Sequence, residues 1–414
     1  SGTLTITDDD VAVITLTPAG SPAESPLVAG TYTISTASTL EIALTVNFAM
    51  SGTAVGADYT LAGAAGFAFP NGTASLSIGA GPRSVVVTLT PVDDALVEGS
   101  ETATLSVTAG VKYSGTPSAN LTILDDDLAT VTVTGSGTPA EGSVSVSTFT
   151  IATTANLAVP LVVNFNMSGL ASAVQGTDYT LAGFASYAGP AGTATLPAGL
   201  ASSVNVTFTV IDDGFVEGPE GVVLTLNAGG YTIGAPASAS LTIADNDTSA
   251  ISITLGGVPA ETGASTGTFT LTATPAPVRD MLVNFAMTGT ASFAGGGDYT
   301  LSGATLSFSQ VTGLGSVTIG VGGSLIVTLT PVDDARVEAS ETAVMTVTAD
   351  VTASDPAYSG TPSQIHSIAD NDTATVTVTS TGTPGEPATT GSYTLTTTAT
   401  LETPVIVIFT MSGT

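Results

Sequence analysis

The feature that most constrains this chain is an internal repeat of about 120 residues. The sequence Asp-Tyr-Thr-Leu begins at Asp58, Asp178 and Asp298, so neighbouring copies are 120 residues apart. Each copy lies within the same series of acidic residues: an early Glu, the Asp of Asp-Tyr, an Asp-Asp pair, a Glu-x-x-Glu sequence and a closing triplet. A repeat of this length within 414 residues predicts three whole structural units with partial units at both ends.

The repeat divides the chain into five expected segments. Residues 1–10 are expected to be the last strand of a preceding repeat. Whole repeats are expected at 11–127, 128–247 and 248–372, named units 1, 2 and 3 below. Residues 373–414 are expected to be an incomplete repeat that holds the first strands only. Because almost no linker separates the repeats, we expect a rod, and we expect the chain to be a segment of a longer array.

Hydrophobic residues alternate with Thr and Ser in short runs along the repeat. Val131–Thr134 and Ile251–Leu255 have the period of two that is typical of half-buried strands. The run Leu44–Met50 recurs at Leu161–Met167 and Met281–Met287. Gly and Pro clusters separate the runs, and no helical period of comparable length occurs. About seven short strands per repeat predict an all-β fold of antiparallel β-sandwiches in tandem.

The composition excludes several classes of partner. A formal charge of −30 with only four basic residues excludes nucleic acid, because phosphate binding needs Lys and Arg. The same charge argues against an anionic membrane surface. No run of about 20 consecutive apolar residues is present, so membrane insertion is not expected. The chain has no cysteine, which leaves neither disulfides nor zinc–thiolate sites.

The charge is concentrated at fixed positions of the repeat. Of the 34 acidic residues, those outside the repeating positions and the run Asp8-Asp9-Asp10 are Glu41, Asp280, Asp350, Asp355 and Glu402. The repeating carboxylates fall at turns between strands, so an even number of strand crossings would gather them at one pole of a sandwich. Like charges there would repel by several kcal/mol at an effective dielectric of about 20. Ca²⁺, with six to eight oxygen ligands, relieves this repulsion better than Mg²⁺.

This set of residues resembles the Calx-β domain, known from sodium–calcium exchangers and from large extracellular repeat proteins. The resemblance covers all three whole units. It implies an immunoglobulin-like sandwich with a calcium cluster at the pole that faces the next domain. Carried over position by position, the implied calcium ligands are Glu24, Asp58, Asp93, Asp94, Glu98, Glu101, Asp125, Asp126 and Asp127 in unit 1, Glu141, Asp178, Asp212, Asp213, Glu217, Glu220, Asp245 and Asp247 in unit 2, and Glu261, Asp298, Asp333, Asp334, Glu338, Glu341, Asp370 and Asp372 in unit 3.

Units 2 and 3 depart from the pattern of unit 1. Asn246 and Asn371 replace the middle Asp of the closing triplet, which predicts fewer or weaker ions in those units. Arg336 lies inside the third acidic loop, where units 1 and 2 have Leu96 and Phe215. It could pair with a ligand carboxylate and lower the occupancy of that site.

The acidic residues also have interpretations other than metal binding. Asp and Asn also form turns, so some of these positions could serve only to order a loop. Paired carboxylates can hydrolyse glycosides, but here the pairs recur in every unit and tryptophan is absent, which argues against an enzyme. The only histidine, His366, lies in a strand pattern and is expected to pack rather than to react.

The sequence therefore predicts a non-enzymatic structural or adhesive protein, extracellular or at the cell surface, in which calcium stiffens the junctions of a rod or filament. The alternatives are a regulatory calcium sensor and a carbohydrate- or receptor-binding adhesin domain. Sheet edges are usually protected by charge, especially Lys, yet the only lysine is Lys112. We therefore also expect self-association, lateral or end-to-end, in a fibre or surface layer.

Overall fold

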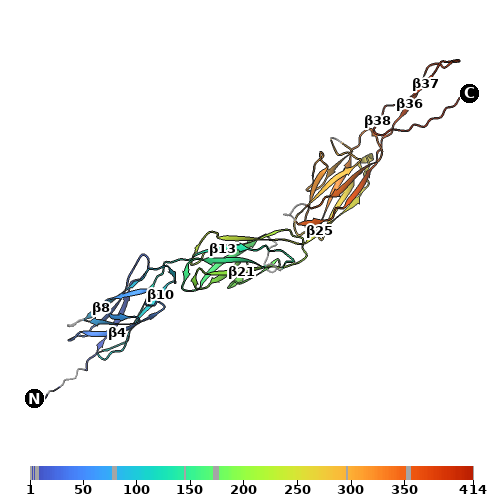
Figure 1. Ribbon diagram of the computed structural model, residues 1–414. Helices are drawn as coiled ribbons and strands as arrows, with labels where there is room; N and C mark the ends of the chain where they lie inside the picture. Colours follow the sequence, from blue (N-terminus) through green and yellow to red (C-terminus); the bar gives the residue numbers. More distant parts are fainter. Residues whose placement is uncertain are drawn as a thin grey trace.

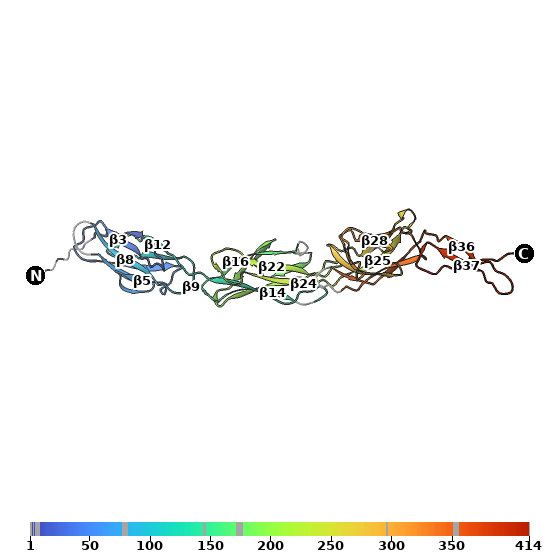
Figure 2. The ribbon, with the colours of Figure 1, turned by 90° about the horizontal axis from the view of Figure 1, so that it is seen from above.

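The protein is an elongated row of β-sandwiches with its termini at opposite ends, as two perpendicular views of the computed structural model show (Figure 1 and Figure 2). The structure describes residues 2, 4, 9–76, 82–143, 146–170, 177–294, 297–350 and 356–413. Most of the strand expected at 1–10 lies outside these residues. The residue limits expected for the units stay predictions.

Unit 1 is built from two main sheets that pack face to face. Within them, every pair of neighbouring strands is antiparallel. One sheet has the order β2 (Thr15–Ala19), β3 (Gly30–Thr36), β8 (Arg83–Pro91), β5 (Tyr59–Ala62). The other has the order β12 (Ser118–Ile123), β10 (Glu101–Val107), β4 (Leu44–Gly52), β7 (Asn71–Leu76), β6 (Ala65–Ala68). A short parallel pair joins β1 (Ala12–Val13) to β11 (Tyr113–Ser114).

Unit 2 repeats this arrangement with two five-stranded sheets. The first has the order β17 (Tyr179–Ala182), β21 (Ser203–Val210), β14 (Ser147–Thr153), β13 (Thr130–Ser136), β23 (Thr232–Ile233). The second has the order β18 (Ser186–Ala188), β19 (Ala191–Leu196), β16 (Leu161–Gly169), β22 (Glu220–Leu226), β24 (Ser238–Ile243). The first strand of the unit, β13, pairs in parallel with β23 near its end.

Unit 3 has the same two sheets in the same order. The first is β28 (Tyr299–Ser302), β31 (Ser324–Pro331), β26 (Gly267–Thr274), β25 (Thr248–Gly256), β34 (Ala357–Ser359). The second is β29 (Ser307–Phe308), β30 (Leu314–Ile319), β27 (Met281–Gly289), β33 (Glu341–Val347), β35 (Ser363–Ile368). The tandem antiparallel β-sandwich fold expected from the strand patterns is confirmed.

Each unit has its own hydrophobic core, because the alternation of the strands turns one side chain in two inward. In β3, the buried positions are every second residue from Gly30 to Thr36. Burying a Phe side chain contributes roughly 1.5–3 kcal/mol. In each unit, a buried ring stacks on a half-buried ring of an equivalent strand, with centroids 6.4, 6.3 and 6.2 Å apart in Phe48–Phe67, Phe165–Tyr187 and Phe285–Phe308.

Short strands join one unit to the next. β9 (Leu96–Val97) of unit 1 pairs in parallel with β15 (Asn156–Leu157) of unit 2, which also pairs with β20 (Gly199–Leu200). β32 (Arg336–Val337) of unit 3 pairs in the same way with β38 (Thr400–Leu401). The hairpin of β36 (Val376–Thr381) and β37 (Ser392–Thr397) precedes β38. The units are therefore joined by backbone hydrogen bonds as well as by the chain itself.

Helix is almost absent from the described residues, which contain one short 3₁₀ turn, η1 (Thr262–Ala264). Within this part of the chain, no helix has the length and apolar character needed to cross a membrane.

One glycine at the end of β27 tests how tightly the sandwich is packed. Gly289 has φ of +129°, and a Cβ added there would lie 2.0 Å from the backbone oxygen of Thr342. We expect Gly289→Ala to lower the free energy of unfolding of unit 3 by at least about 1 kcal/mol, because a non-glycine residue is strained there. Calorimetric melting checks this, with Gly322→Ala as control, since a Cβ there meets nothing within 4 Å. Equal melting of the two variants would contradict the expected strain.

Candidate metal centre

The acidic residues of each unit converge because the start of the unit runs alongside its end. In unit 1, the Glu24 N–H donates to the Leu124 carbonyl at 3.1 Å, and the Leu124 N–H donates to the Pro22 carbonyl at 2.9 Å. The equivalent bonds to the early Glu of the other units are Glu141 N–H to Ala244 O at 3.0 Å and Glu261 N–H to Ala369 O at 3.1 Å. This pairing places the early Glu beside the closing triplet.

A second set of backbone bonds brings the Asp-Tyr position to the Asp-Asp loop. The Asp58 carbonyl accepts the Val92 N–H at 2.9 Å, directly before Asp93 and Asp94. The same bond joins Ile211 to Asp178 and Val332 to Asp298, each at 2.9 Å. Four chain segments that are far apart in sequence therefore meet at one pole of each sandwich.

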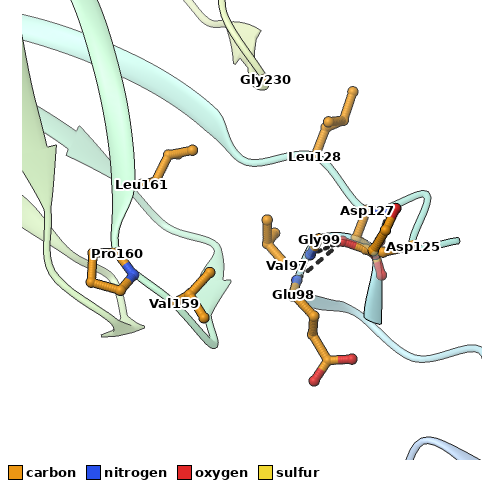
Figure 3. A pocket seen from close by; sticks show the side chains of 11 residues that line it. Val97, Glu98, Gly99, Asp125, Asp127, Leu128, Val159, Pro160, Leu161 and Gly230 are labelled. Carbon is orange, nitrogen blue, oxygen red and sulfur yellow. Dashed lines mark hydrogen bonds between the residues drawn. The ribbon is translucent and has the colours of Figure 1, made fainter. Parts of the chain in front are cut away.

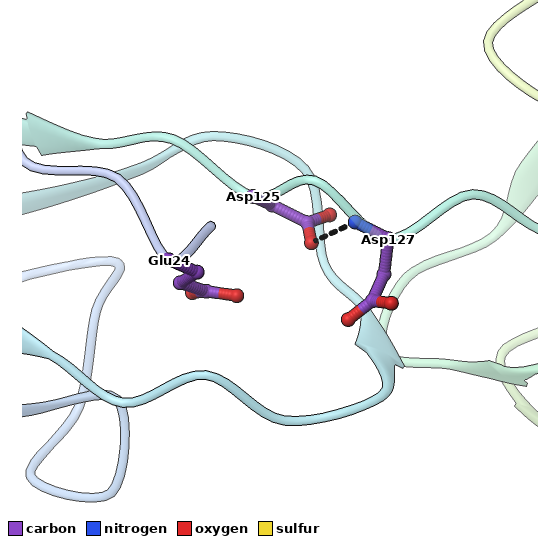
Figure 4. A group of neighbouring side chains, drawn as sticks. All are labelled: Glu24, Asp125 and Asp127. Atoms are coloured by element: carbon purple, nitrogen blue, oxygen red, sulfur yellow. Dashed lines mark hydrogen bonds between the residues drawn. The ribbon is translucent and has the colours of Figure 1, made fainter. Parts of the chain in front are cut away.

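Groups of neighbouring carboxylates lie at the pole of unit 1, and two of them share Glu24. Each group brings one oxygen per residue within 4.8 Å of the others. The groups are Glu24–Asp125–Asp127, Glu24–Asp93–Asp126 and Asp58–Glu98–Glu101. Figure 4 shows the first, in which Glu24 approaches the triplet from a separate segment.

Units 2 and 3 bring together the equivalent residues. In unit 2, Glu141–Asp245–Asp247 and Asp178–Glu217–Glu220 each lie within the same 4.8 Å. In unit 3, Glu341 hydrogen-bonds to Asp298, and Glu261 lies close enough to Asp370, Glu338 and Asp334 for their charges to raise its pKa. Every implied ligand lies near another acidic residue of its own unit.

Some of these carboxylates organise the loops. Asp125 accepts the N–H groups of Glu98 and Gly99 through one oxygen, at 3.1 and 2.7 Å, and that of Asp127 through the other, at 3.0 Å. Asp245 repeats all three bonds, and Asp370 repeats those from Glu338 and Asp372. Asp94, Asp213 and Asp334 each accept the N–H two residues later, at 2.7 to 2.8 Å. These aspartates therefore fix the loop geometry whether or not they also touch an ion.

Other carboxylate oxygens are buried without any hydrogen-bond partner among the described residues. Glu220 is 2% exposed, and neither of its carboxylate oxygens has a partner. The pattern recurs at matching positions, with one oxygen each of Glu141, Glu261, Glu338, Glu341, Asp127, Asp247 and Asp372. A buried acceptor without a donor is costly, so these oxygens are suited to accept a proton or a cation.

Burial and mutual repulsion raise the pKa values of the clustered glutamates. Desolvation is the larger cause, followed by the neighbouring carboxylates. The pKa of Glu24, Glu101, Glu217, Glu220 and Glu261 is raised from 4.5 to about 7. The pKa of Glu141 and Glu341 is raised to about 8. Protons and cations therefore compete for these oxygens near neutral pH.

The donor set fits a hard cation. It consists of carboxylate oxygens with backbone carbonyls nearby, and it contains no sulfur, because the chain has no cysteine. His366 takes no part in these clusters. It is 4% exposed, with Nε2 3.1 Å from the Thr268 carbonyl and its ring 4.9 Å from that of Phe269, so it packs in unit 3.

The departures in units 2 and 3 have a clear structural effect. Asn246 Nδ2 donates to Asp212 Oδ1 at 3.1 Å, and Asn371 Nδ2 donates to Asp333 Oδ1 at 3.0 Å. The neutral amide thus donates a hydrogen bond to an aspartate at the place where Asp126 and Asp93 of unit 1 bring two like charges together. Arg336 pairs with Asp334, with Nε 3.5 Å from Oδ2, as its position in the acidic loop suggested.

Two residues at these poles were missed by the sequence analysis. The first is Glu402 of the following segment, which pairs with Arg336. The second is Arg279 of unit 3, which donates from Nη2 to the Pro219 carbonyl of unit 2 at 3.0 Å. When the strand that begins at Leu161 is aligned with the equivalent run that begins at Val405, Ala158 and Glu402 occupy the same position of the repeat. That alignment is the signal that could have identified this joint.

The raised pKa values predict an unusual dependence of stability on pH. Without metal, the folded chain retains protons that the unfolded chain releases, so the free energy of unfolding falls as pH rises from about 5 to about 8. Melting in chelator across this range measures the fall. Glu220→Gln should flatten it, because one of the titrating groups is removed. A melting temperature that rises with pH would contradict this prediction.

Comparisons with known proteins add little. No protein-family model and no curated protein matches this sequence. Among solved structures, the apo-form Calx CBD1 domain is 17% identical, with a TM-score of 0.23, over 29% of this chain and 100% of that one. The calcium-binding domain CBD12 of CALX1.1 is 13% identical, with a TM-score of 0.23, over 58% and 99%. The Yersinia pseudotuberculosis adhesin InvE is 9% identical, with a TM-score of 0.29, over 58% and 60%. At these values the fold rests on the strand pairing above, and the candidate site rests on the carboxylate geometry.

Proposed function

We propose that this chain is part of a non-enzymatic, extracellular structural or adhesive protein of Calx-β type, in which calcium stiffens the joints of a rod. The observation that carries the proposal is the recurrence of buried carboxylate oxygens without hydrogen-bond donors at the same pole of each unit. A cation supplies what the described protein atoms do not. Calcium suits a set of carboxylate oxygens because it accepts six to eight such ligands in flexible geometry.

The position of the clusters supports a structural role. Each cluster includes the loop that bonds to the following unit, so the ion would lie at the joint between two sandwiches. Extracellular calcium is abundant enough to keep modest sites filled. Units 2 and 3 keep every carboxylate position of unit 1 except that of Asp126, and such recurrence fits a structural role at each joint better than a single reaction centre. In this role, Asp125, Asp245 and Asp370 shape the loops, and the unbonded oxygens hold the ion.

Calcium should bind the folded chain and raise its melting temperature. At a calcium concentration about a hundredfold above the dissociation constant, each site adds about 2.7 kcal/mol to the free energy of unfolding. Titration calorimetry and melting in calcium or chelator measure both effects. The double substitution Asp58→Asn with Glu101→Gln should weaken binding in unit 1 by about tenfold or more, since ligand charge tunes affinity.

The matched control for that variant is Glu41→Gln, which changes an exposed carboxylate outside the cluster. It should bind calcium as the unaltered chain does. Absence of calcium binding by the unaltered chain, with equal melting in calcium and chelator, would overturn the proposed function.

We also propose that the rods associate with one another, laterally or end to end. The exposed sheet faces carry neutral hydroxyl pairs across strands, such as Ser106–Ser118 and Ser136–Thr148 at 2.9 Å. A face of this kind has little charge to repel a second copy, and the single lysine leaves the strand edges without their usual protection.

Self-association should appear in sedimentation velocity as a sedimentation coefficient that rises with protein concentration in calcium. Substituting lysine on one face, with Ser106→Lys and Ser118→Lys together, should reduce the rise because like charges then meet across the contact. A chain that stays monomeric at all accessible concentrations would contradict association.

A further inference from the structure

The three joints share one backbone contact. The valine that follows each Asp-Asp pair accepts an N–H from the next unit. Ala158 donates to Val97 at 3.0 Å, Val278 donates to Val216 at 3.1 Å, and Glu402 donates to Val337 at 3.3 Å. The next residue after each valine is a glutamate of the carboxylate cluster. The same short loop therefore carries both a carboxylate of the cluster and the carbonyl that bonds to the next unit, so a change in the position of one moves the other.

Among the described residues, none of the side chains that line the first joint is basic. Unit 2 presents Val159, Pro160 and Leu161 to a cleft of about 240 Å³, whose other wall includes Val97 and Asp127 of unit 1 (Figure 3). The two basic residues of unit 1 lie elsewhere. Arg83 begins β8, about 25 Å of extended strand away from the Asp-Asp loop that follows it. Lys112 lines a different hollow, together with Glu41.

The second joint contains a guanidinium that comes from the following unit. Arg279 donates to the Pro219 carbonyl at 3.0 Å, and Pro219 lies between Glu217 and Glu220 in the chain. Its positive charge lowers the pKa of both glutamates, against the larger effect of burial. A cation of unit 3 therefore faces the carboxylates of unit 2.

The third joint contains a guanidinium that comes from the preceding unit. Arg336 lies between Asp334 of its own loop and Glu402 of the following segment, and it hydrogen-bonds to Glu402. Two of the four basic residues of the chain thus lie at two joints. The first joint instead has the extra carboxylate of Asp126, for which the next units have an amide.

We propose that Arg279 and Arg336 are built-in counter-charges that keep the second and third joints docked when calcium is removed, and that the first joint, which lacks one, is where the rod bends. The inference rests on the proposed calcium binding. If an arginine contact stabilises the docked joint by about 1 kcal/mol, the ratio of docked to undocked joints changes about fivefold. That ratio is what a measurement of distances across each joint reports.

The absence of cysteine allows spin labels to be placed without background labelling. Thr60, Thr180 and Thr300 are exposed and occupy the same position in β5, β17 and β28. Cysteine pairs at 60 and 180, at 180 and 300, and at 300 and 394 report the three joints of the full chain by electron–electron double resonance. In calcium, all three distance distributions should be narrow. In chelator, only the first should broaden.

Two substitutions test the role assigned to the arginines. Arg279→Gln should make the second joint broaden in chelator, whereas Lys112→Gln, which removes a basic residue away from these three joints, should not. The pair Leu96→Arg with Ala158→Glu transfers the contact of the third joint to the first and should keep it narrow without calcium. Melting in calcium shows that each variant is folded.

The outcomes separate this inference from the proposed function. Calcium binding with equal broadening at all three joints in chelator, or a second joint that stays narrow in Arg279→Gln, overturns the role of the arginines and leaves calcium binding intact. Lack of calcium binding in calorimetry overturns the proposed function itself.

Discussion

Closure of each sandwich brings like-charged carboxylates together at one pole, and their mutual repulsion is the constraint on which the rest of the structure depends. The start of the unit bonds to its end through Glu24 and Leu124 and their equivalents, so the first glutamate meets the last aspartates. The same closure buries the core and crowds the carboxylates. Burial then raises the pKa of glutamates such as Glu220 and Glu261. Under the proposed function, a cation would relieve the crowding while the sheets stay closed, so the fold itself brings together the residues that would hold the ion.

Much of this was predictable from the sequence. The alternation of Thr and Val predicts the strands, and the 120-residue repeat predicts which acids gather, because a sandwich returns its chain to the same pole. The sequence does not predict which carboxylates accept backbone N–H groups and which do not. Asp125 and Glu24 are both simply acidic residues at repeating positions of the sequence. Only the backbone geometry shows that both oxygens of Asp125 accept N–H groups, while Glu24 approaches it from another segment.

The joints show why the remaining features escaped sequence reasoning. Arg279 acts on a cluster of the preceding unit, and the partner of Arg336 is Glu402, 66 residues later. A pattern within one repeat does not record contacts between neighbouring repeats. Asn246 and Asn371 show the opposite case, since their departure from the repeat marked a real difference. The amide donates a hydrogen bond to an aspartate where unit 1 has a second carboxylate.

The bond that joins one unit to the next uses only main-chain atoms. The valine carbonyl and the following N–H exist whatever the side chains are, so the contact sets the direction of the rod without demanding a matched surface. A repeat could therefore be duplicated or deleted without redesign of its neighbours. The length of such a molecule would then follow the number of repeats encoded, while side chains at each joint remain free to set how stiff that joint is.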